Sequence, residues 1–348
     1  MAQVIPTIDL SSFGPGGSEI DQKAAAAELY EACSRLGFAN LKGIGISTER
    51  LDDAFAFSRR LFNLPLEEKM KAPHPAQPMP HRGYSPAGME KVYSKAERDA
   101  QVESDEAGES LRKVEDHKES FEIGNEENKF QPNIFLPDSI FPGFKDKGLQ
   151  LYDDFHKAGC RILDALCMAL DVDSDEAARL KKLHSGQNNQ LRLLHYPSIE
   201  TKKLQSKVVG RMPPHQDWSS FTFLFQDSVG GLELQDPQTK EYMRSVPEKG
   251  VCILNVGDML MRYSNGAFPS AMHKVTLPPD TTNDGEGVTK GRYAIPYFFA
   301  PDHEAMVEPL PSLHRAEARP KFEPVRWCDY GEYMAKHMYK AKQEASRG

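Results

Sequence analysis

The stretch that decides the fold runs Met212-Pro213-Pro214-His215-Gln216-Asp217-Trp218-Ser219-Ser220-Phe221-Thr222-Phe223-Leu224-Phe225-Gln226. We interpret it as a strand that is entered from a loop. Residues i and i+2 of a strand lie on the same face, so His215 and Asp217 are expected to point the same way. An imidazole and a carboxylate aimed together supply two ligands of a 2-His-1-carboxylate site for non-haem Fe(II), which leaves open coordination positions.

The third ligand of such a site has to be a second histidine. Between His215 and the end of the last predicted strand at Phe299, the sequence holds one further histidine, His273. A late strand of a jelly roll can bring His273 opposite the first pair. The alternative is a core or surface histidine hydrogen-bonded to a neighbour, which is the usual state of an isolated histidine. The strongly β run after Asp217, and turn residues between the two histidines, favour the metal site over a chance His-x-Asp.

Length and composition exclude several classes of protein. The 348 residues can bury a sizeable core and suit one large domain, or a domain with a helical annex. A net charge of -8 without a Lys/Arg face argues against a nucleic-acid binder. Five scattered cysteines without Cys-x-x-Cys spacing indicate neither a disulfide framework nor a zinc ribbon. With no leader pattern and no apolar run near the roughly 20 residues that span a bilayer, we expect a cytoplasmic protein without membrane contacts.

The first part of the chain is expected to be rich in helix. Helical spacing of apolar residues predicts helices over 20–36, over 48–61, over 149–170 and over 175–183, with a closing helix over 327–342. The polar segment 95–112 has no sustained periodicity and is interpreted as a solvated loop or exposed helix, with a mobile lid as the alternative.

From residue 190 onward the apolar pattern changes to that of strands. Six strand-like runs are predicted at 191–196, 221–226, 232–235, 251–255, 271–276 and 293–299. Most are bounded by Gly, Pro, Asp or Asn, which is typical of a compact antiparallel barrel or jelly roll rather than a βαβ sheet. The predicted fold class is therefore α+β, with a jelly-roll core flanked by helices.

Arg292 opens the last of these strands, in Gly291-Arg292-Tyr293-Ala294-Ile295-Pro296. An arginine at the head of a buried strand can hold a carboxylate in bidentate fashion, which lysine cannot reproduce. Tyr196, at the end of the first predicted strand, offers a phenol that could assist. The alternative for Arg292 is a salt bridge to an acidic residue at the mouth of the barrel, and the residues alone leave both open.

Together these motifs resemble those of the isopenicillin N synthase-like Fe(II)/2-oxoglutarate oxygenases. The resemblance rests on His215-x-Asp217, His273 and Arg292 with Tyr196 upstream, and on Arg82-Gly83-Tyr84 and Lys118-Glu119-Ser120-Phe121 ahead of them. It extends from Ile5 to the strand of Arg292 and looks closest to fungal members, including thymine hydroxylase and the loline-type alkaloid oxygenases. It implies a double-stranded β-helix core that uses Fe(II), 2-oxoglutarate and O2. The implied iron ligands are His215, Asp217 and His273, and the implied partners of the distal carboxylate of 2-oxoglutarate are Arg292 and Tyr196.

The sequence departs from the family pattern at two places. The family has Arg-x-Ser after the last strand begins, whereas this chain has Ala294 in place of the serine. The missing hydroxyl would weaken cosubstrate binding by about 1–2 kcal/mol unless Tyr196 or a water replaces it. The interval from His273 to Arg292 is also longer than usual, through a polar insertion over 281–290. We interpret that insertion as a solvated hairpin, with a role at the pocket entrance as the alternative.

Four residues match positions that touch substrate in members of the family, or adjoin the iron pair: Arg82, Tyr84, Trp218 and Phe298. For each the alternative is a core aromatic residue or a surface cation. If Arg82 faces the pocket, a carboxylate-bearing substrate is expected.

We divide the chain into four segments of one compact domain. They are an α-rich N-terminal support region with a substrate-side loop (1–130), a helical spine (131–186), the jelly-roll core with the iron and 2-oxoglutarate sites (187–305) and a C-terminal helical tail (306–348). The oligomeric state is not indicated by the sequence.

Three functions follow as hypotheses. The leading one is a 2-oxoglutarate-dependent dioxygenase that hydroxylates, desaturates or cyclises a small metabolite of fungal secondary metabolism. The second is an oxidase of the isopenicillin N synthase type, which uses Fe(II) and O2 but no 2-oxoglutarate; Ala294 is the feature that favours it. The third is a non-catalytic jelly-roll binding protein with a vestigial metal site.

Overall fold

The computed structural model describes residues 5–75, 81–89, 115–205, 209–278, 287–314 and 319–334. The polar segment 95–112, most of the insertion 281–290 and the end of the closing helix beyond residue 334 lie outside the described residues. Within the described chain, residues 327–334 are helical, as expected for the start of that closing helix.

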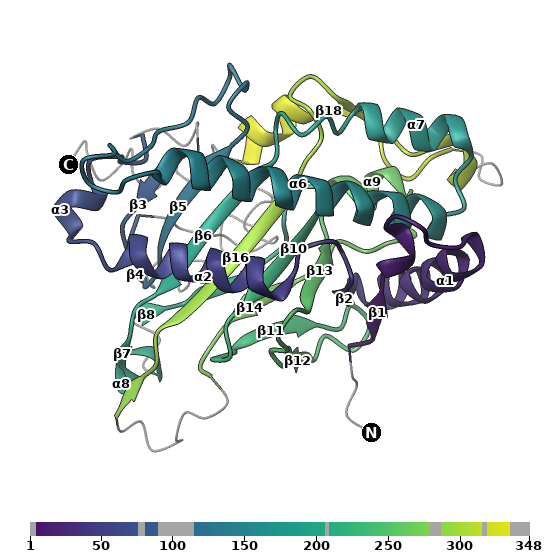
Figure 1. The fold of residues 1–348 in the computed structure, drawn as a ribbon. Coiled ribbons are helices and arrows are strands. Elements are labelled where there is room, and N and C mark those ends of the chain that lie inside the picture. The colour runs from purple at the N-terminus through teal and green to yellow at the C-terminus, as the bar shows by residue number, and fades with distance from the viewer. Residues whose placement is uncertain are drawn as a thin grey trace.

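The strands are organised in two larger sheets (Figure 1). An eight-stranded sheet has the order β1-β2-β13-β10-β16-β6-β5-β3, and a four-stranded sheet has the order β12-β11-β14-β9. Apart from the parallel pair β1 and β2, the neighbours in both sheets are antiparallel. Helices accompany both sheets, which confirms the predicted α+β class.

The strands of the eight-stranded sheet are β1 (Thr7–Asp9), β2 (Phe38–Lys42), β3 (Gly83–Ser85), β5 (Glu119–Gly124), β6 (Gln190–Tyr196), β10 (Phe221–Gln226), β13 (Cys252–Val256) and β16 (Arg292–Phe299). Those of the four-stranded sheet are β9 (Met212–His215), β11 (Leu232–Gln235), β12 (Tyr242–Arg244) and β14 (His273–Val275). Three short pairs join β4 (Glu115–Asp116) to β8 (Val209–Gly210), β7 (Ile199–Glu200) to β15 (Val288–Thr289), and β17 (Met306–Val307) to β18 (Val325–Arg326).

The described helices begin and end where local chemistry favours it. They are α1 (Glu19–Leu36), α2 (Thr48–Phe62), α3 (Leu66–Lys69), α6 (Phe144–Ala169), α7 (Ser174–Lys182), α8 (Thr201–Gln205) and α9 (Asp258–Tyr263), with 3-10 turns η1 (Ser11–Phe13) and η2 (Pro311–His314). The side chains of Ser18, Ser47 and Asp173 accept hydrogen bonds from the first turns of α1, α2 and α7. Gly37, with a φ of 72°, ends α1 in the left-handed conformation.

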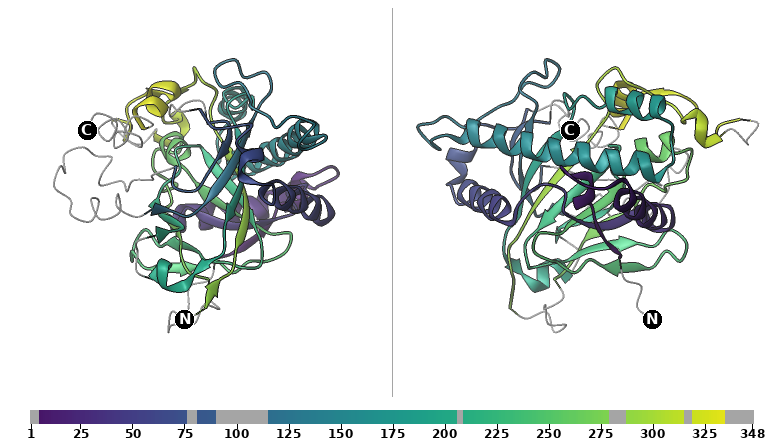
Figure 2. Two further views of the ribbon diagram at one scale, coloured as in Figure 1. Left: turned by 90° about the vertical axis from the view of Figure 1, so that its left-hand side faces the viewer. Right: turned by 45° about the vertical axis from the view of Figure 1, so that its right-hand side comes forward.

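One face of the eight-stranded sheet packs against helices. The long helix α6 and helix α2 run across this face, and the left view of Figure 2 shows the helices on one side of the strands. Phe223 of β10 stacks on Phe155 of α6 with ring centroids 5.6 Å apart. A Cβ at Gly159 would lie 2.4 Å from the ring of Phe299, so α6 approaches β16 this closely only with glycine there.

The other face of the same sheet points toward the four-stranded sheet. A second, smaller apolar cluster joins Leu194, Tyr196 and Ala294 of the large sheet to Leu232, Leu234 and Val275 of the small one. Strand alternation puts the phenylalanines of β10 on the helix side and leaves Thr222 and Gln226 on this inner side. The candidate site therefore lies between the two sheets. Its residues on β10 alternate along the strand with the phenylalanines that pack against the helices.

The predicted strand 221–226 is present as β10, but the expectation that His215 and Asp217 lie on one strand is wrong. β9 ends at His215 in the four-stranded sheet, and β10 begins at Phe221 in the eight-stranded sheet. The chain crosses between the sheets over residues 216–220, where Asp258 N–H donates to Asp217 O at 2.9 Å. The alternation of a strand does not run through such a crossing, so the positions of His215 and Asp217 need another explanation.

Strands from both ends of the chain share one sheet. β1, β2, β3 and β5 come from the segment 1–130, whereas β6, β10, β13 and β16 come from the segment 187–305. The proposed segments therefore contribute to a common core, and their boundaries stay a prediction. Among the helices whose residues are described, none combines the length and the apolar character that a membrane crossing requires.

Candidate functional site

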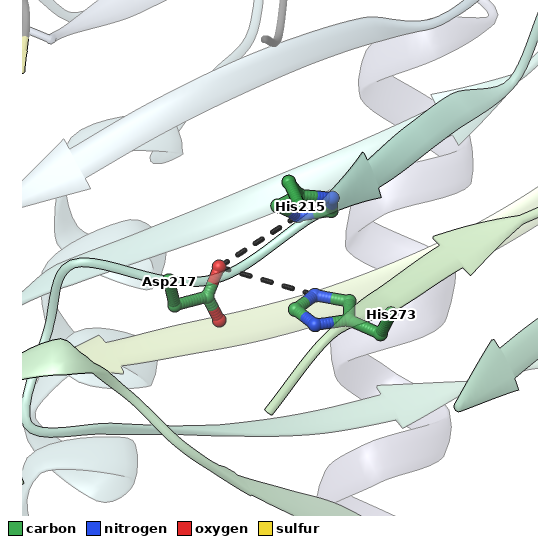
Figure 3. A group of neighbouring side chains, drawn as sticks. All are labelled: His215, Asp217 and His273. Carbon is green, nitrogen blue, oxygen red and sulfur yellow. Dashed lines mark ion pairs between the residues drawn. The ribbon is translucent and has the colours of Figure 1, made fainter. Parts of the chain in front are cut away.

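The side chains of His215, Asp217 and His273 lie together between the two sheets (Figure 3). His215 ends β9 and His273 begins β14, and the two are cross-strand partners with ring centroids 4.1 Å apart. Asp217 lies in the crossing loop. Its Oδ1 is 3.7 Å from Nε2 of His215 and 3.9 Å from Nε2 of His273. One ligand atom from each of the three residues thus lies within 4.8 Å of the other two.

Backbone carbonyl groups orient both imidazole rings. Nδ1 of His215 lies 2.9 Å from Pro213 O, and Nδ1 of His273 lies 3.1 Å from Ala271 O. A carbonyl oxygen can only accept a hydrogen bond, so these partners assign the proton to Nδ1 in each ring. Each Nε2 then carries a lone pair directed at the centre of the group, which is the form that binds a metal.

The carboxylate of Asp217 is oriented in the same manner. Its Oδ2 accepts hydrogen bonds from Thr222 Oγ1 at 2.6 Å and from Asn255 Nδ2 at 2.8 Å. Thr222 and Asn255 are cross-strand partners on β10 and β13, so the large sheet holds the carboxylate rigidly. Oδ1 is left to face the two imidazoles. The sequence motifs did not reveal these two partners. Asn255 lies on a strand that pairs with β10 only in the fold, and Thr222, five residues after Asp217, reaches it because the chain turns between the sheets.

Electrostatics favour the metal-binding protonation states. Burial, together with the charge of His273, lowers the pKa of His215, so its imidazole is neutral. Burial acts to raise the pKa of Asp217, but the two histidines and the two hydrogen bonds outweigh it and hold that pKa below the ordinary value. Two imidazoles and one carboxylate, each with a lone pair directed at the centre of the group, fit an Fe(II) ion in the 2-His-1-carboxylate arrangement.

Arg292 and Tyr196 also meet in the fold. They are cross-strand partners on β16 and β6, both 1% exposed, and the guanidinium carbon lies 5.2 Å from the centroid of the tyrosine ring. Arg292 Nη2 donates to Gln226 Oε1 at 2.9 Å. Its buried Nε has no hydrogen-bond partner among the described residues. The partner observed is a neutral amide rather than the carboxylate that the salt-bridge alternative required.

A second buried arginine, Arg211, lies beside this pair and was missed from the sequence. It is 2% exposed, and its guanidinium carbon lies 5.6 Å from the centroid of the Tyr196 ring. Nη2 donates to Lys290 O, whereas Nε and Nη1 have no hydrogen-bond partner in the part of the chain that the structure describes. Burial, followed by the charge of Arg292, lowers the pKa of Arg211 to about 10.

Two of the four predicted substrate residues lie near the metal-ligand group. Trp218 is half-buried and directly follows Asp217. Phe298 is half-buried on β16 and is the cross-strand partner of Thr222, so its side chain is on the inner face. The guanidinium of Arg192 lies 5.5 Å from the Phe298 ring and forms an ion pair at 2.6 Å with Glu122, whose carboxylate is fully buried. This ion pair was not foreseen, because its members lie on separate strands.

The other two predicted substrate residues make contacts within the protein. The hydroxyl of Tyr84 donates to Glu119 Oε2 at 2.5 Å, and the same carboxylate binds Lys69 at 2.6 Å and His195 at 2.8 Å. Arg82 is 1% exposed, packs against Gly124 and donates to His81 O at 2.6 Å. These contacts hold β3 against β5, and a role of either residue in substrate binding stays a prediction.

Comparisons with known proteins identify the family. Residues 5–142 match the model of the non-haem dioxygenase in morphine synthesis N-terminal region, and residues 187–301 match the 2OG-Fe(II) oxygenase superfamily. A 2-oxoglutarate-dependent dioxygenase of Dothideomycetidae sp. strain 11243 is 32% identical over 98% of this chain and 99% of its own. A proline hydroxylase of Petromyces alliaceus is 36% identical over 88% of this chain and 91% of its own.

A solved structure agrees with the sequence relatives. The full-length Neurospora crassa enzyme crystallised with alpha-KG and thymine has a TM-score of 0.82 and 30% identity, and covers 98% of each chain. The chain therefore belongs to the 2OG-Fe(II) oxygenase superfamily. It is an Fe(II)- and 2-oxoglutarate-dependent dioxygenase that uses O2 and acts on a small molecule. The resemblance indicated by the motifs and the double-stranded β-helix core are confirmed, and the two alternative functions are disfavoured.

Proposed function

We propose that this dioxygenase oxidises an unactivated C–H bond of a small metabolite at a centre held by His215, Asp217 and His273. Arg292 and Tyr196 bind the distal carboxylate of 2-oxoglutarate. The observation that carries the proposal is the convergence of three directed ligand atoms, since both Nε2 atoms approach the same Oδ1 while the remaining polar atoms of the three side chains are engaged elsewhere.

With Fe(II), 2-oxoglutarate and O2 bound, such a centre supplies an oxidant strong enough to remove hydrogen from carbon, which leads to hydroxylation, desaturation or ring closure. The chain's own residues act by position. The carbonyls of Pro213 and Ala271 fix the tautomers, and Thr222 and Asn255 prevent rotation of the carboxylate, so the three side chains would hold an Fe(II) ion without rearranging.

The inner face beside the metal-ligand group suggests a polar substrate. Lys118 is a buried cation there and Arg192 a half-buried one, and Lys118 is close enough for its charge to lower the pKa of His215, after the larger effects of burial and His273. Phe298 supplies an apolar ring between this region and Thr222. We therefore extend the proposal to a small metabolite of fungal secondary metabolism that carries a carboxylate or another hydrogen-bonding group.

Relatives support a compact substrate of this kind. One is named a proline hydroxylase, and another was crystallised with thymine. A cytoplasmic location, as expected from the sequence, is part of the same proposal.

The test is a substrate screen with purified, Fe(II)-loaded protein. Small cyclic amino acids and pyrimidine bases are supplied with 2-oxoglutarate and O2, and substrate-dependent succinate is measured together with product mass. We expect a gain of one oxygen atom or a loss of two hydrogen atoms in a product. His215→Ala should abolish turnover while retaining the fold, whereas His314→Ala, a histidine outside the group, should not. Substrate-dependent succinate from His215→Ala at the wild-type rate would remove the ligand assignment.

A further inference from the structure

Two buried arginines flank one tyrosine ring in the cosubstrate region. The guanidinium carbons of Arg292 and Arg211 lie 5.2 and 5.6 Å from the centroid of the Tyr196 ring. The three side chains come from different places, since Arg292 begins β16, Tyr196 ends β6 and Arg211 immediately precedes β9. The eight-stranded and four-stranded sheets therefore both contribute a cation to the same small volume.

This pair of cations has an excess of positive charge. The hydrogen bonds described for the two guanidinium groups go to neutral oxygen atoms, Gln226 Oε1 and Lys290 O. Three further donor atoms, Arg211 Nε, Arg211 Nη1 and Arg292 Nε, are buried without a partner among the described residues. The carboxylate of Asp227 also acts on Arg211, but it affects the pKa of that guanidinium less than burial and the charge of Arg292 do. One carboxylate does not neutralise two guanidinium groups, and a buried cation whose charge is not neutralised is costly. Buried donors are also rarely left unpaired in native proteins. Such an arrangement suits an anionic ligand.

Ala294, which replaces the serine of the family pattern, lies beside Arg292. Ala294 follows Arg292 by two residues on β16, so both side chains are on the inner face, and Ala294 is fully buried. Its cross-strand partner on β10 is Gln226, the residue that accepts from Arg292. An alanine cannot donate a hydrogen bond, whereas a guanidinium offers several donors in a planar fork.

We propose that Arg211 is a second cosubstrate-binding residue, which shares the distal carboxylate of 2-oxoglutarate with Arg292 and takes over from the hydroxyl that Ala294 lacks. The inference rests on the proposed function of Arg292 and Tyr196. The competing account is that Arg211 is structural and acts only by packing on Tyr196 and holding Lys290 O. If Arg211 binds the cosubstrate, its removal should weaken only ligands that carry the distal carboxylate. If Arg211 is structural, its removal should affect both kinds of ligand alike.

The test compares two 2-oxo acids that differ at the distal end alone. 2-Oxopentanoate has the same chain length as 2-oxoglutarate but ends in a methyl group in place of the distal carboxylate. Binding of each to the anaerobic Fe(II)-loaded protein is measured by calorimetry, for the wild type and for Arg211→Met. We expect Arg211→Met to weaken 2-oxoglutarate about tenfold to a hundredfold, the usual value of a hydrogen bond to a charged group. Its affinity for 2-oxopentanoate should stay unchanged.

Three further variants test which property of Arg211 the ligand requires. Arg211→Lys keeps the charge but loses the fork, so it should recover part of the lost 2-oxoglutarate affinity. Ala294→Ser added to Arg211→Met restores a hydroxyl in the pocket and should also recover part of it. Arg244→Met is the matched control, because Arg244 on β12 is half-exposed and pairs with Glu233. It should bind both oxo acids as the wild type does.

The outcomes separate a structural role of Arg211 from a failure of the proposed 2-oxoglutarate site. If Arg211→Met binds 2-oxoglutarate like the wild type, or loses both oxo acids by the same factor, Arg211 is structural and the inference is wrong. If the wild type itself fails to bind 2-oxoglutarate, the proposed function of the pocket fails instead. Iron stoichiometry and far-ultraviolet circular dichroism show whether a variant is folded, and Arg211→Gln replaces Arg211→Met if the latter does not fold.

Discussion

The group of His215, Asp217 and His273 and the proposed cosubstrate site at Arg292 lie on the same inner face of the fold but differ in how their polar atoms are paired. Around His215, Asp217 and His273, the outer atoms are satisfied by Pro213, Ala271, Thr222 and Asn255, and the remaining lone pairs converge. Around Arg211 and Arg292, buried donors are left without partners in the described chain. The first region is prearranged for a cation, and the second has positive charge that an anion would neutralise.

This difference predicts that the two regions respond differently when their ligands bind. A ligand set with its protons and rotations already fixed needs no rearrangement when an ion binds. A pair of buried guanidinium groups with only Asp227 acting on them as an opposite charge instead destabilises the protein without its ligand, so binding of a carboxylate should raise stability.

Asp217→Ala should have the largest effect, because it removes the carboxylate to which both imidazoles point. We expect iron affinity to fall by more than about 100-fold, beyond the loss usually seen when only an outer partner of a metal ligand is removed. Iron content after anaerobic loading and gel filtration measures this. The control is Asp153→Ala, since Asp153 is an exposed residue of α6 paired with Lys157. Full iron content in Asp217→Ala would disprove the ligand role.

Arg292→Met should separate the two regions. Removing one partner of a buried charge pair costs about 3 kcal/mol or more, which corresponds to a loss of more than about 100-fold in 2-oxoglutarate affinity. Iron binding should be unchanged, because Arg292 makes no described contact with the metal ligands. Titration of 2-oxoglutarate into the Fe(II) protein checks both quantities. Equal loss of iron and 2-oxoglutarate would mean that the two regions are one cooperative unit.

His184 is a buried histidine whose two ring nitrogens both have hydrogen-bond partners within the protein. Its Nδ1 lies 2.7 Å from Leu180 O and its Nε2 lies 2.7 Å from Ser220 Oγ, so both nitrogens are used inside the protein. Burial lowers its pKa from 6.5 to about 4. The unfolded chain therefore binds the proton more tightly than the folded one. The stability contributed by neutral His184 is complete above about pH 6.5 and is lost as the pH falls to about 4.

The shift at His184 corresponds to about 3 kcal/mol of unfolding free energy across that range. His184→Gln keeps hydrogen-bonding atoms but removes the titration, so it should flatten the pH dependence by about this amount. Urea unfolding of the metal-free protein at several pH values between 4 and 7 measures the slope. An unchanged slope in His184→Gln would show that other groups control the acid limb.

Thr222→Val should have the smallest effect. It deletes the 2.6 Å hydrogen bond to Asp217 Oδ2 but leaves the bond from Asn255 Nδ2. We expect roughly a tenfold loss of metal affinity, at the lower end for an outer partner of a metal ligand. Competition with a fluorescent chelator gives the affinity, and Thr239→Val on an exposed turn serves as the control. Unaltered affinity would show that Asn255 alone orients the carboxylate.

The sequence predicted correctly those helices and strands that have strong local signals. The helix that Gly37 ends, the helix that Ser47 caps and strand β10 lie where periodicity and capping place them. The three candidate ligands and the pair of Arg292 and Tyr196 are brought together as expected, although their roles stay proposals. His215 and Asp217, however, converge across a sheet-to-sheet crossing and not along one strand.

The residues that were missed share a physical cause. Arg211, Asn255 and the Arg192–Glu122 pair act on residues that are distant in sequence. Thr222 is only five residues from Asp217, but the two meet because the chain turns between the sheets over 216–220. A single sequence contains no signal for such pairing. For Tyr84 the fold adds a contact that the sequence did not indicate, the hydrogen bond of its hydroxyl to Glu119, and its role in substrate binding stays a prediction.

The most direct test of the whole account is an anaerobic titration of the Fe(II)-loaded protein with 2-oxoglutarate. The visible charge-transfer band of a chelated Fe(II) complex should appear and saturate at one equivalent, which would require both the metal-ligand group and the arginine pocket. The band should be absent in Asp217→Ala and should need far more 2-oxoglutarate in Arg292→Met. Iron binding without any band in the wild type would contradict the account, because the centre would then hold metal but not its cosubstrate.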